Sequence, residues 1–225
     1  MTSATRAPRR DATENRAALL EAARVVLNRD PDAGLDAIAA EAGLTRRAVY
    51  GHFANRDALL LELVERGTSR VAAALVSVDH PEPLIRLALI ASRMWQEVDS
   101  VTVMTLFAVR GPFQAQVAER LRPVRRHLSD TVREGARLEP QKRVRSDIPA
   151  DTLARLIEGA AIAVLDEAAR TRMSAAAGRR LAMLAVLAIA GLDAAAANRL
   201  IDETPALRTQ PAPPNAPAPL SGVPA

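Results

Sequence analysis

The stretch Ala42-Gly-Leu-Thr-Arg-Arg-Ala-Val-Tyr-Gly-His-Phe53 decides how the rest of this chain is interpreted. Gly43 is suited to a tight turn, because a left-handed backbone costs any other residue more. Thr45 then serves as a helix N-cap, since its hydroxyl can accept from an orphan amide of the next turn. The stretch therefore predicts a turn followed by a short helix.

The two sides of this short helix differ in chemistry. At about 100° per residue, Val49 and Phe53 share one face, which predicts a contact with a core. Arg46, Arg47 and Tyr50 lie around the other side. Because a helix of about two turns is marginal alone, neighbouring helices must hold it. The helix thus has one face that packs on a core and two arginines at its exposed N-terminus. This arrangement favours a recognition helix, which contacts another molecule through its exposed side.

Helices are predicted on both sides of the turn. Apolar residues at helical spacing predict helices over 13–27, 35–42 and 55–66. Pro31 and Gly34 mark a loop between the first two, and Asn55 is a suitable N-cap for the third. Two short helices joined by a glycine turn, the second with a polar face, are typical of a helix-turn-helix.

The matching residues of a known family are Leu19-Leu20-Glu21-Ala22-Ala23, Ile38-Ala39, Ala42-Gly43-Leu44-Thr45, Tyr50, His52-Phe53 and Leu59-Leu60. On these residues, 16–60 resemble the DNA-binding domain of the TetR family of transcriptional regulators. The chain departs from the family pattern at Gly34, where a Ser or Thr cap is usual, and at Arg56, where Lys is common. The loop at Asp30-Pro31 also lacks the usual glycine.

The resemblance implies a role for each residue of the reading helix. It implies that the phosphate backbone is contacted by Thr45, Tyr50, His52 and Arg56. Arg46 and Arg47 would reach base edges in the major groove, where an arginine fork pairs best with guanine. Gly51 has no side chain to hold the duplex away. On the residues alone, the two arginines could equally be solvated surface charge, and Tyr50 simple packing.

Composition favours an all-α fold, because 49% of residues are apolar but only 2% are aromatic. After residue 66, further helices are predicted over 82–98, 101–109, 112–138, 150–172 and 174–200, with 139–149 irregular. The 101–109 segment is apolar nearly all round, which predicts burial, and Pro123 should kink or split its helix. The predicted domains are an arm (1–12), a helix-turn-helix DNA-binding domain (13–66), a helical ligand-binding and dimerisation domain (67–202) and a Pro-rich disordered tail (203–225).

The second domain offers candidates for a ligand pocket and a dimer interface. Bulky soft side chains and one histidine could line the pocket: Met94, Trp95, Met104, Phe107, Phe113 and His127. Each could also be plain core. The last two helices are apolar on several sides, and the resemblance implies that they pair with their copies through Leu153, Leu156, Ile157, Ala160, Val164, Leu181, Leu184, Ala188 and Leu192. Burial of both helices within one chain is the alternative.

Several classes of protein are disfavoured by the sequence. Without cysteine, disulfide and thiolate chemistry are excluded. The three histidines lie far apart with no clustered ligand partner, so we expect no metal site and no cofactor. No nucleophile–base pair or phosphate-binding glycine loop is recognisable, and we expect no enzyme. The longest apolar run, from Leu181 to Leu192, is too short to span a bilayer, which predicts a cytoplasmic protein without membrane contact.

Residues 1–66 hold ten arginines and ten acidic residues, so DNA affinity must come from the placement of charges. The sequence therefore predicts a TetR-like repressor that binds a (pseudo)palindromic double-stranded DNA operator as a homodimer. A small apolar or amphipathic effector would release it. Two alternatives stay open: a ligand-independent architectural DNA-binding protein, and an enzyme within residues 67–200.

Overall fold

The computed structural model describes residues 7–139 and 144–208, and in these ranges every regular element is a helix, which confirms the all-α prediction. The helices form two compact units. The head unit comprises residues 7–73 and 101–124, and the body unit comprises residues 74–100, 125–139 and 144–208. No helix in the described part of the chain combines the length and the apolar character needed to cross a bilayer.

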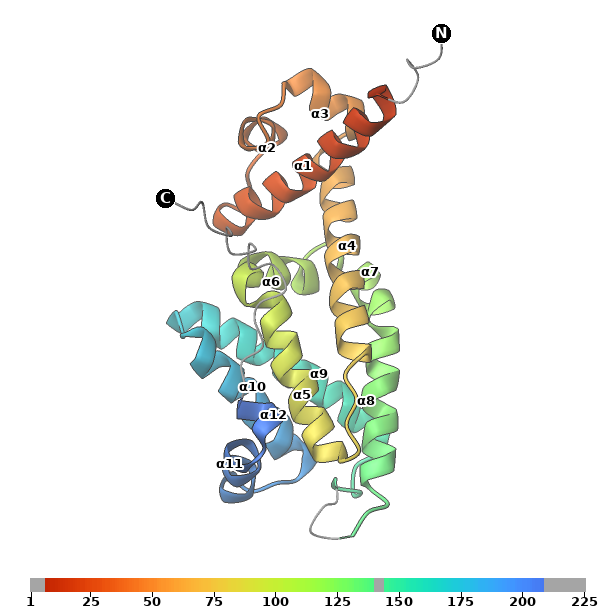
Figure 1. Ribbon diagram of the computed structural model, residues 1–225, viewed down its shortest axis with the longest axis vertical. Helices are drawn as coiled ribbons and strands as arrows, with labels where there is room; N and C mark the ends of the chain where they lie inside the picture. Colours follow the sequence, from red (N-terminus) through yellow and green to blue (C-terminus); the bar gives the residue numbers. More distant parts are fainter. Residues whose placement is uncertain (1–6, 140–143, 209–225) are drawn as a thin grey trace, which may run out of the picture. The chain divides into compact units, whose positions relative to one another are not determined.

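The head unit begins with α1 (Ala7–Arg29), α2 (Leu35–Glu41), α3 (Arg46–His52) and α4 (Arg56–Val76), the last as far as residue 73 (Figure 1). Its core contains the fully buried side chains of Leu19, Ala23, Leu27, Ile38, Val49, Leu59 and Leu60. Two helices are longer than predicted. Residues 7–12, placed in the arm, belong to α1, and α4 continues ten residues past the predicted end at 66. Residues 1–6 lie outside the described ranges.

The head unit also contains α6 (Thr102–Arg110) and α7 (Gln114–Arg120), and η1 (Asp99–Val101) precedes α6, with only its last residue in this unit. α6 packs against α1, and the amide of Met104 donates to Asn28 Oδ1 at 3.5 Å. Burial of the 101–109 segment on all sides is wrong in part, because Val103 remains 39% exposed. An apolar side chain favours burial, but the packing of α6 on α1 decides which face of α6 is buried.

Pro123 separates two helices, as its position predicts. α7 ends at Arg120, and α8 (Arg122–Gly135) begins two residues later. Pro123 is thus the second residue of α8, where the missing amide hydrogen has no intrahelical partner to lose. The predicted long helix over 112–138 is therefore two helices.

The body unit consists mainly of α5 (Pro83–Val98), α8 from residue 125, α9 (Ala150–Thr171) and α10 (Ala175–Ala190). α5 packs against α10, and α10 against α9 (Figure 1). Gly178 permits the first contact, because a Cβ there would overlap the indole ring of Trp95. The close approach of α5 and α10 places most of α5 in the core of the unit.

The predicted single helix over 174–200 is wrong. Gly191 adopts a left-handed backbone with φ of +110° and ends α10, and Asp193 caps α11 (Ala194–Glu203) by accepting from the Ala196 amide at 2.7 Å. Past α11, the predicted tail holds α12 (Pro205–Arg208), whose Leu207 is 1% exposed. Buried Arg179 donates to the Leu207 carbonyl at 2.8 Å, which ties α12 to α10. Residues 209–225 lie outside the described ranges.

Candidate nucleic-acid interface

The turn before α3 has the predicted geometry. Gly43 has φ of +66°, and the amides of Gly43 and Leu44 donate to carbonyls of Ala40 and Ala39 at the end of α2. Thr45 is extended, and its Oγ1 accepts from the Ala48 amide at 3.3 Å. These contacts satisfy orphan groups at both helix ends that meet in the turn. The angle at which α3 leaves α2 is therefore held by backbone contacts.

α3 has one buried and one exposed face, as its sequence predicts. Val49 and Phe53 are 0% and 2% exposed, whereas Tyr50 is 47% exposed. Arg46 and Arg47 are exposed at the start of the helix. Among the residues selected from the sequence, the structure thus brings Thr45, Arg46, Arg47, Tyr50 and Gly51 together on one exposed surface, which we call the reading face.

The two arginines of the reading face have different surroundings. Arg46 Nη1 lies 2.9 Å from Asp36 Oδ2 of α2, and its guanidinium lies 5.5 Å from the centre of the Tyr50 ring. Both members of this ion pair are more than half exposed, so it contributes at most about 1 kcal/mol and a phosphate can compete for the arginine. Arg47 has no hydrogen bond or ion pair with the described residues, so its five donors face solvent.

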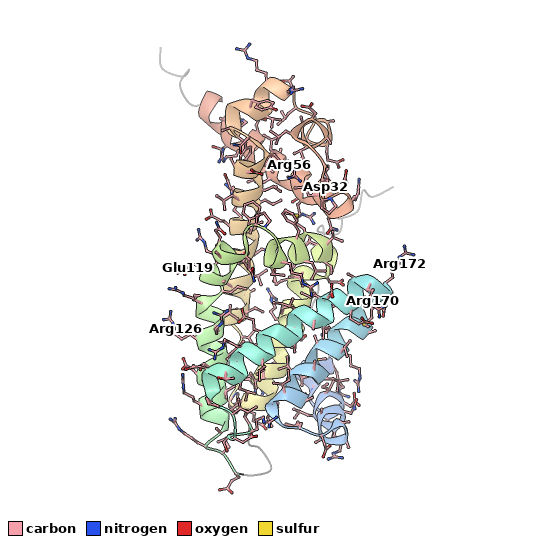
Figure 2. All side chains as sticks on the ribbon, turned by 180° about the vertical axis from the view of Figure 1, so that it is seen from behind. Asp32, Arg56, Glu119, Arg126, Arg170 and Arg172 are labelled. Atoms are coloured by element: carbon pink, nitrogen blue, oxygen red, sulfur yellow. The ribbon has the colours of Figure 1, made fainter. Side chains whose placement is uncertain are left out.

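Arg56 has a role that the sequence did not predict. Its Nε donates to the Ala33 carbonyl at 2.9 Å, and its Nη2 donates to the Pro31 carbonyl. Figure 2 shows Arg56 beside Asp32 of the same loop. Its side chain therefore closes the loop before α2, and these donors are not available to a phosphate. His52 is half-buried, and its carbonyl accepts from Arg16 Nη1 at 2.8 Å.

Gly34 leaves α2 without a side-chain cap, and its backbone is extended with φ of −83° and ψ of 172°. α2 nevertheless forms and ends only one residue before the predicted 42, because Leu35, Ile38 and Ala39 are buried in the head core. The missing cap, which departs from the family pattern, is therefore offset by packing.

The residues of the predicted ligand pocket are divided between the two units. Met104 and Phe113 belong to the head core, where Phe107 packs against them with its ring centre 6.2 Å from that of Phe113. Met94 and Trp95 are buried in the body unit, and His127 Nε2 lies 2.9 Å from the Val78 carbonyl. The apolar side chains are buried, except for the partly buried Phe107, but they belong to two different units. Met104, Phe107 and Phe113 are therefore removed from the candidate pocket.

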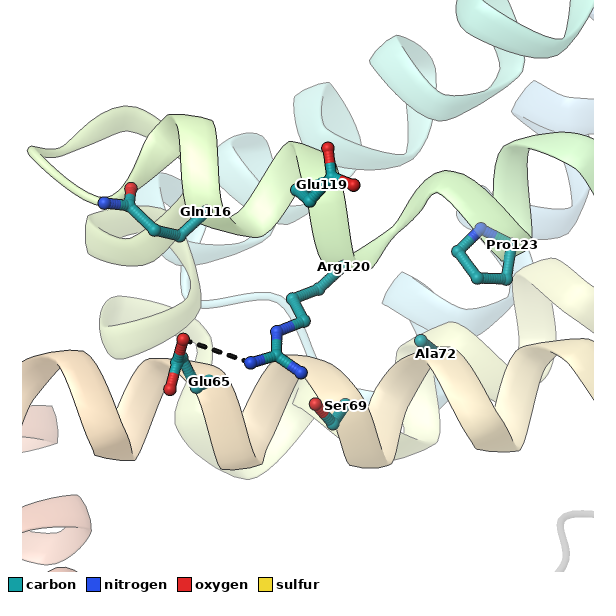
Figure 3. A pocket seen from close by; sticks show the side chains of 7 residues that line it. All are labelled: Glu65, Ser69, Ala72, Gln116, Glu119, Arg120 and Pro123. Carbon is teal, nitrogen blue, oxygen red and sulfur yellow. Dashed lines mark hydrogen bonds and ion pairs between the residues drawn. The ribbon is translucent and has the colours of Figure 1, made fainter.

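A cleft of about 590 Å³ lies in the head unit, between α4 on one side and α7 with the start of α8 on the other (Figure 3). It is lined by Glu65, Ser69, Ala72, Gln116, Glu119, Arg120 and Pro123. Arg120 reaches across it to Glu65, with 3.1 Å between Nη2 and Oε1. Five of these seven residues are polar or charged, unlike the apolar side chains that the sequence predicted for a pocket.

The predicted dimer residues divide into two groups. Leu153, Ile157 and Val164 are buried in the core of their own unit, so they are removed from the predicted interface. The others reach the surface of α9, of α10 or of the turn after α10 to differing extents: Leu156, Ala160, Leu181, Leu184, Ala188 and Leu192. Leu156 is 48% exposed, and a Cβ on Gly159 would meet no atom within 4 Å. The spacing of apolar residues along α9 predicted a helix with apolar faces. It did not predict which of these faces packs against the rest of its own chain.

In the described ranges, no three histidine, aspartate or glutamate side chains gather closely enough to hold a metal ion.

Two residues that contact α3 were not predicted from the sequence, Arg16 and Asp36. The partners of Arg16 lie 36 and 46 residues away, so no local pattern could have indicated them.

Comparison with known proteins gives a family for the head unit. A family model described as bacterial regulatory proteins of the tetR family matches residues 19–63, which cover α2, α3 and parts of α1 and α4. A search of curated proteins returns no match for the chain.

Solved structures share the fold of most of the chain. FadR, a transcriptional regulator from Bacillus subtilis in complex with stearoyl-CoA, has a TM-score of 0.63 at 15% identity, over 76% of this chain and 97% of that one. SmeT, the repressor of a multidrug efflux pump of Stenotrophomonas maltophilia, has a TM-score of 0.60 at 23% identity, with 76% and 86% covered. LfrR, a TetR-like regulator from Mycobacterium smegmatis in complex with proflavine, has a TM-score of 0.61 at 19% identity, with 82% and 98% covered.

At these identities the structural likeness concerns the fold, while the family model matches the residues that build the turn and the reading face. The two findings agree with the geometry of α2, the Gly43 turn and α3. Residues 19–63 thus carry a helix-turn-helix that matches the bacterial regulatory proteins of the tetR family, and the chain shares the fold of solved transcriptional regulators.

Proposed function

We propose that this regulator is a repressor that binds a (pseudo)palindromic operator as a homodimer and leaves it when a small molecule binds. The observation that carries the proposal is the reading face of α3. Arg46, Arg47 and Tyr50 are exposed there, while Val49 and Phe53 on the opposite side are buried in the head core. A short helix that is fixed by its buried face can enter the major groove, where its exposed donors bind base edges.

Sequence selectivity would rest on the arginines. Arg47 is free to form a fork with guanine O6 and N7, and Arg46 keeps donors beyond the one that Asp36 accepts. Thr45 and the first amides of α3 would hold a phosphate. Tyr50, next to Arg46, would contact the backbone. Selection of bound duplexes from a random pool tests this function, and an enriched inverted repeat is the expected result.

The homodimer would form through the surface of α9 and α10. Leu156 and Ala188 are exposed there, and Gly159 leaves room for a close approach. A second copy on this surface would cover exposed apolar side chains. It would also set two reading faces at the distance of successive major grooves on one side of the duplex, about 34–36 Å.

Replacing Leu156 by glutamate is expected to weaken the dimer at least about tenfold, because a carboxylate would be desolvated in the interface without a partner. The dissociation constant is measured by analytical ultracentrifugation. Leu138→Glu is the matched control, since Leu138 is also exposed, at 37%, but lies outside α9 and α10. A wild type that is monomeric, or equal constants for both variants, would exclude this surface as the interface.

The effector would contact one turn of α5. Arg93 Nε, Trp95 Nε1 and Gln96 Oε1 are buried and have no hydrogen-bond partner among the described residues. A buried polar atom left unpaired costs about 1–3 kcal/mol, which a ligand group can recover. Stearoyl-CoA in FadR and proflavine in LfrR both combine apolar and polar parts. Met94 and Trp95 therefore stay in our candidate site, and the effector is amphipathic.

Transmission of the effector signal would use contacts inside the head unit. α7 is tied to α4 by Arg120 and Glu65, and α6 packs against α1. A displacement of α6 and α7 would therefore shift both helices that flank α3. DNA affinity falls if the effector binds the two arrangements unequally.

Trp95 is the chain's single tryptophan, so its fluorescence reports directly on this site. Titration with proflavine and with stearoyl-CoA is expected to give saturable quenching by at least one of them. Trp95→Phe keeps an aromatic ring but removes the indole donor. We expect about three- to tenfold more effector to be needed for half-release of the operator, the size of one hydrogen bond. Release at an unchanged concentration would remove Trp95 from the site, and a duplex never released by either compound would favour an architectural protein.

A further inference from the structure

Arg16 of α1 contacts three parts of the head unit at once. Its Nη1 donates to the His52 carbonyl at 2.8 Å, and its Nε donates to Glu62 Oε1 of α4 at 3.2 Å, with Nη2 on the other carboxylate oxygen. The guanidinium also lies 4.4 Å from the centre of the Phe53 ring. One side chain thus joins α1, the end of α3 and α4.

The contact with His52 acts at a weak point of α3. α3 is seven residues long, and His52 is its last residue, so this carbonyl is one of the acceptors left without a partner inside the helix. A cation at this position satisfies the acceptor and interacts favourably with the negative end of the helix dipole. The same helix carries Arg46 and Arg47 at its other end.

The contact with Glu62 holds the guanidinium in one orientation. Two parallel N–H···O bonds from Nε and Nη2 form a fork on the carboxylate, a geometry that lysine cannot reproduce. The two side chains are 37% and 20% exposed, which makes the pair less screened than one on the open surface. Arg66, one turn further along α4, also pairs with Glu62 at 2.7 Å and keeps its carboxylate in place.

We propose that Arg16 is a positioning residue for DNA recognition: it fixes the orientation of α3 between α1 and α4 and so determines operator selectivity without touching DNA. This proposal rests on the proposed function. A tilt of α3 misplaces the arginine forks relative to base edges, whereas phosphate contacts tolerate it better because they carry no sequence information. Loss of Arg16 therefore acts on selective binding first.

The test compares Arg16→Met and Arg16→Lys in the full-length protein. Each variant is titrated onto the duplex selected with the wild type and onto random-sequence duplex, at several salt concentrations. For Arg16→Met we expect affinity for the selected duplex to fall about tenfold or more, the size of a lost charge-assisted hydrogen bond. Affinity for random duplex should stay within about twofold, with an unchanged salt dependence, because no phosphate contact is lost.

Arg16→Lys should give an intermediate loss, because a lysine keeps the charge near Glu62 but cannot also reach the His52 carbonyl in a fork. It keeps the test decisive if the methionine variant fails to fold. Arg24→Met is the matched control: Arg24 lies on the same helix and pairs with Glu21 three residues away, but this pair does not join α1 to α3. The control should bind both duplexes as the wild type does.

Equal losses on both duplexes, or a smaller salt dependence, would overturn the proposal, because Arg16 would then support only folding or contact phosphate. Unchanged affinity for the selected duplex in Arg16→Met would overturn it as well. A wild type that selects no sequence at all would contradict the proposed function itself, and with it the proposal. A selective wild type with equally selective Arg16 variants contradicts the proposal alone.

Discussion

Replacing Arg47 by alanine is expected to weaken binding to the selected operator by about ten- to a hundredfold, the range for one arginine fork on guanine. Binding to random duplex should fall by less than about threefold. Arg47 is exposed at the start of α3 and has no competing partner among the described residues. Its donors are therefore free for base edges, whereas one donor of Arg46 is already accepted by Asp36.

The matched control for this prediction is Arg122→Ala. Arg122 is also largely exposed, with 65% of its side chain accessible, and belongs to the head unit, but it lies on α8 and pairs with Glu119. Its removal subtracts the same charge away from the reading face. Fluorescence anisotropy with both duplexes at one salt concentration measures the effect. Equal losses on operator and random duplex in Arg47→Ala would show that Arg47 contacts phosphate only.

Replacing Gly178 by alanine is expected to destabilise the body unit by about 1–3 kcal/mol, the usual cost of overpacking a core. The added Cβ would overlap the ring of Trp95, which is 3% exposed and has nowhere to move within the contact of α5 and α10. Chemical denaturation followed by circular dichroism measures the change. The sign is informative, because alanine in a helix otherwise stabilises relative to glycine.

Gly67→Ala in α4 is the control for this helix effect, since a Cβ there would meet nothing within 4 Å. It should stabilise the protein by up to about 1 kcal/mol. Trp95→Phe should recover part of the loss in Gly178→Ala, because the smaller ring withdraws from the added methyl. Additive effects of the two substitutions would contradict the packing described for α5 and α10.

The turn at Gly43 and helix α3 could be predicted from the sequence because each of their features is local. The positive φ of Gly43, the cap at Thr45 and the burial of Val49 and Phe53 depend on residues within a few positions. Pro123 separated α7 from α8 for the same kind of reason, since a proline restricts the chain at its own position. Local chemistry was enough wherever the structural cause was local.

Gly191 shows where local interpretation stopped. The apolar run continues across it, so the pattern suggested one helix, although a glycine followed by Asp193 is also a helix end followed by an N-cap. Both interpretations fit the sequence. The left-handed backbone of Gly191, packed beside Arg145, decides between them only in the folded chain.

The residues predicted for the pocket and the interface have different surroundings in the fold, because apolar character does not specify which partner a side chain packs against. Phe113 and Trp95 are both buried, yet one lies in the head core and the other in the body unit. Leu153 and Leu156 lie on one helix, but only the first is covered by its own chain. The position of Arg16 depends likewise on Glu62, which is distant in sequence.

The ratio of dissociation constants for random and selected duplex, measured with the wild type at one physiological salt concentration, tests most directly whether α3 reads a sequence. A specific regulator has a ratio of about 10³ or more, with two chains bound to each selected duplex. A ratio near one would contradict our account, because the exposed arginines of α3 would then only neutralise phosphates.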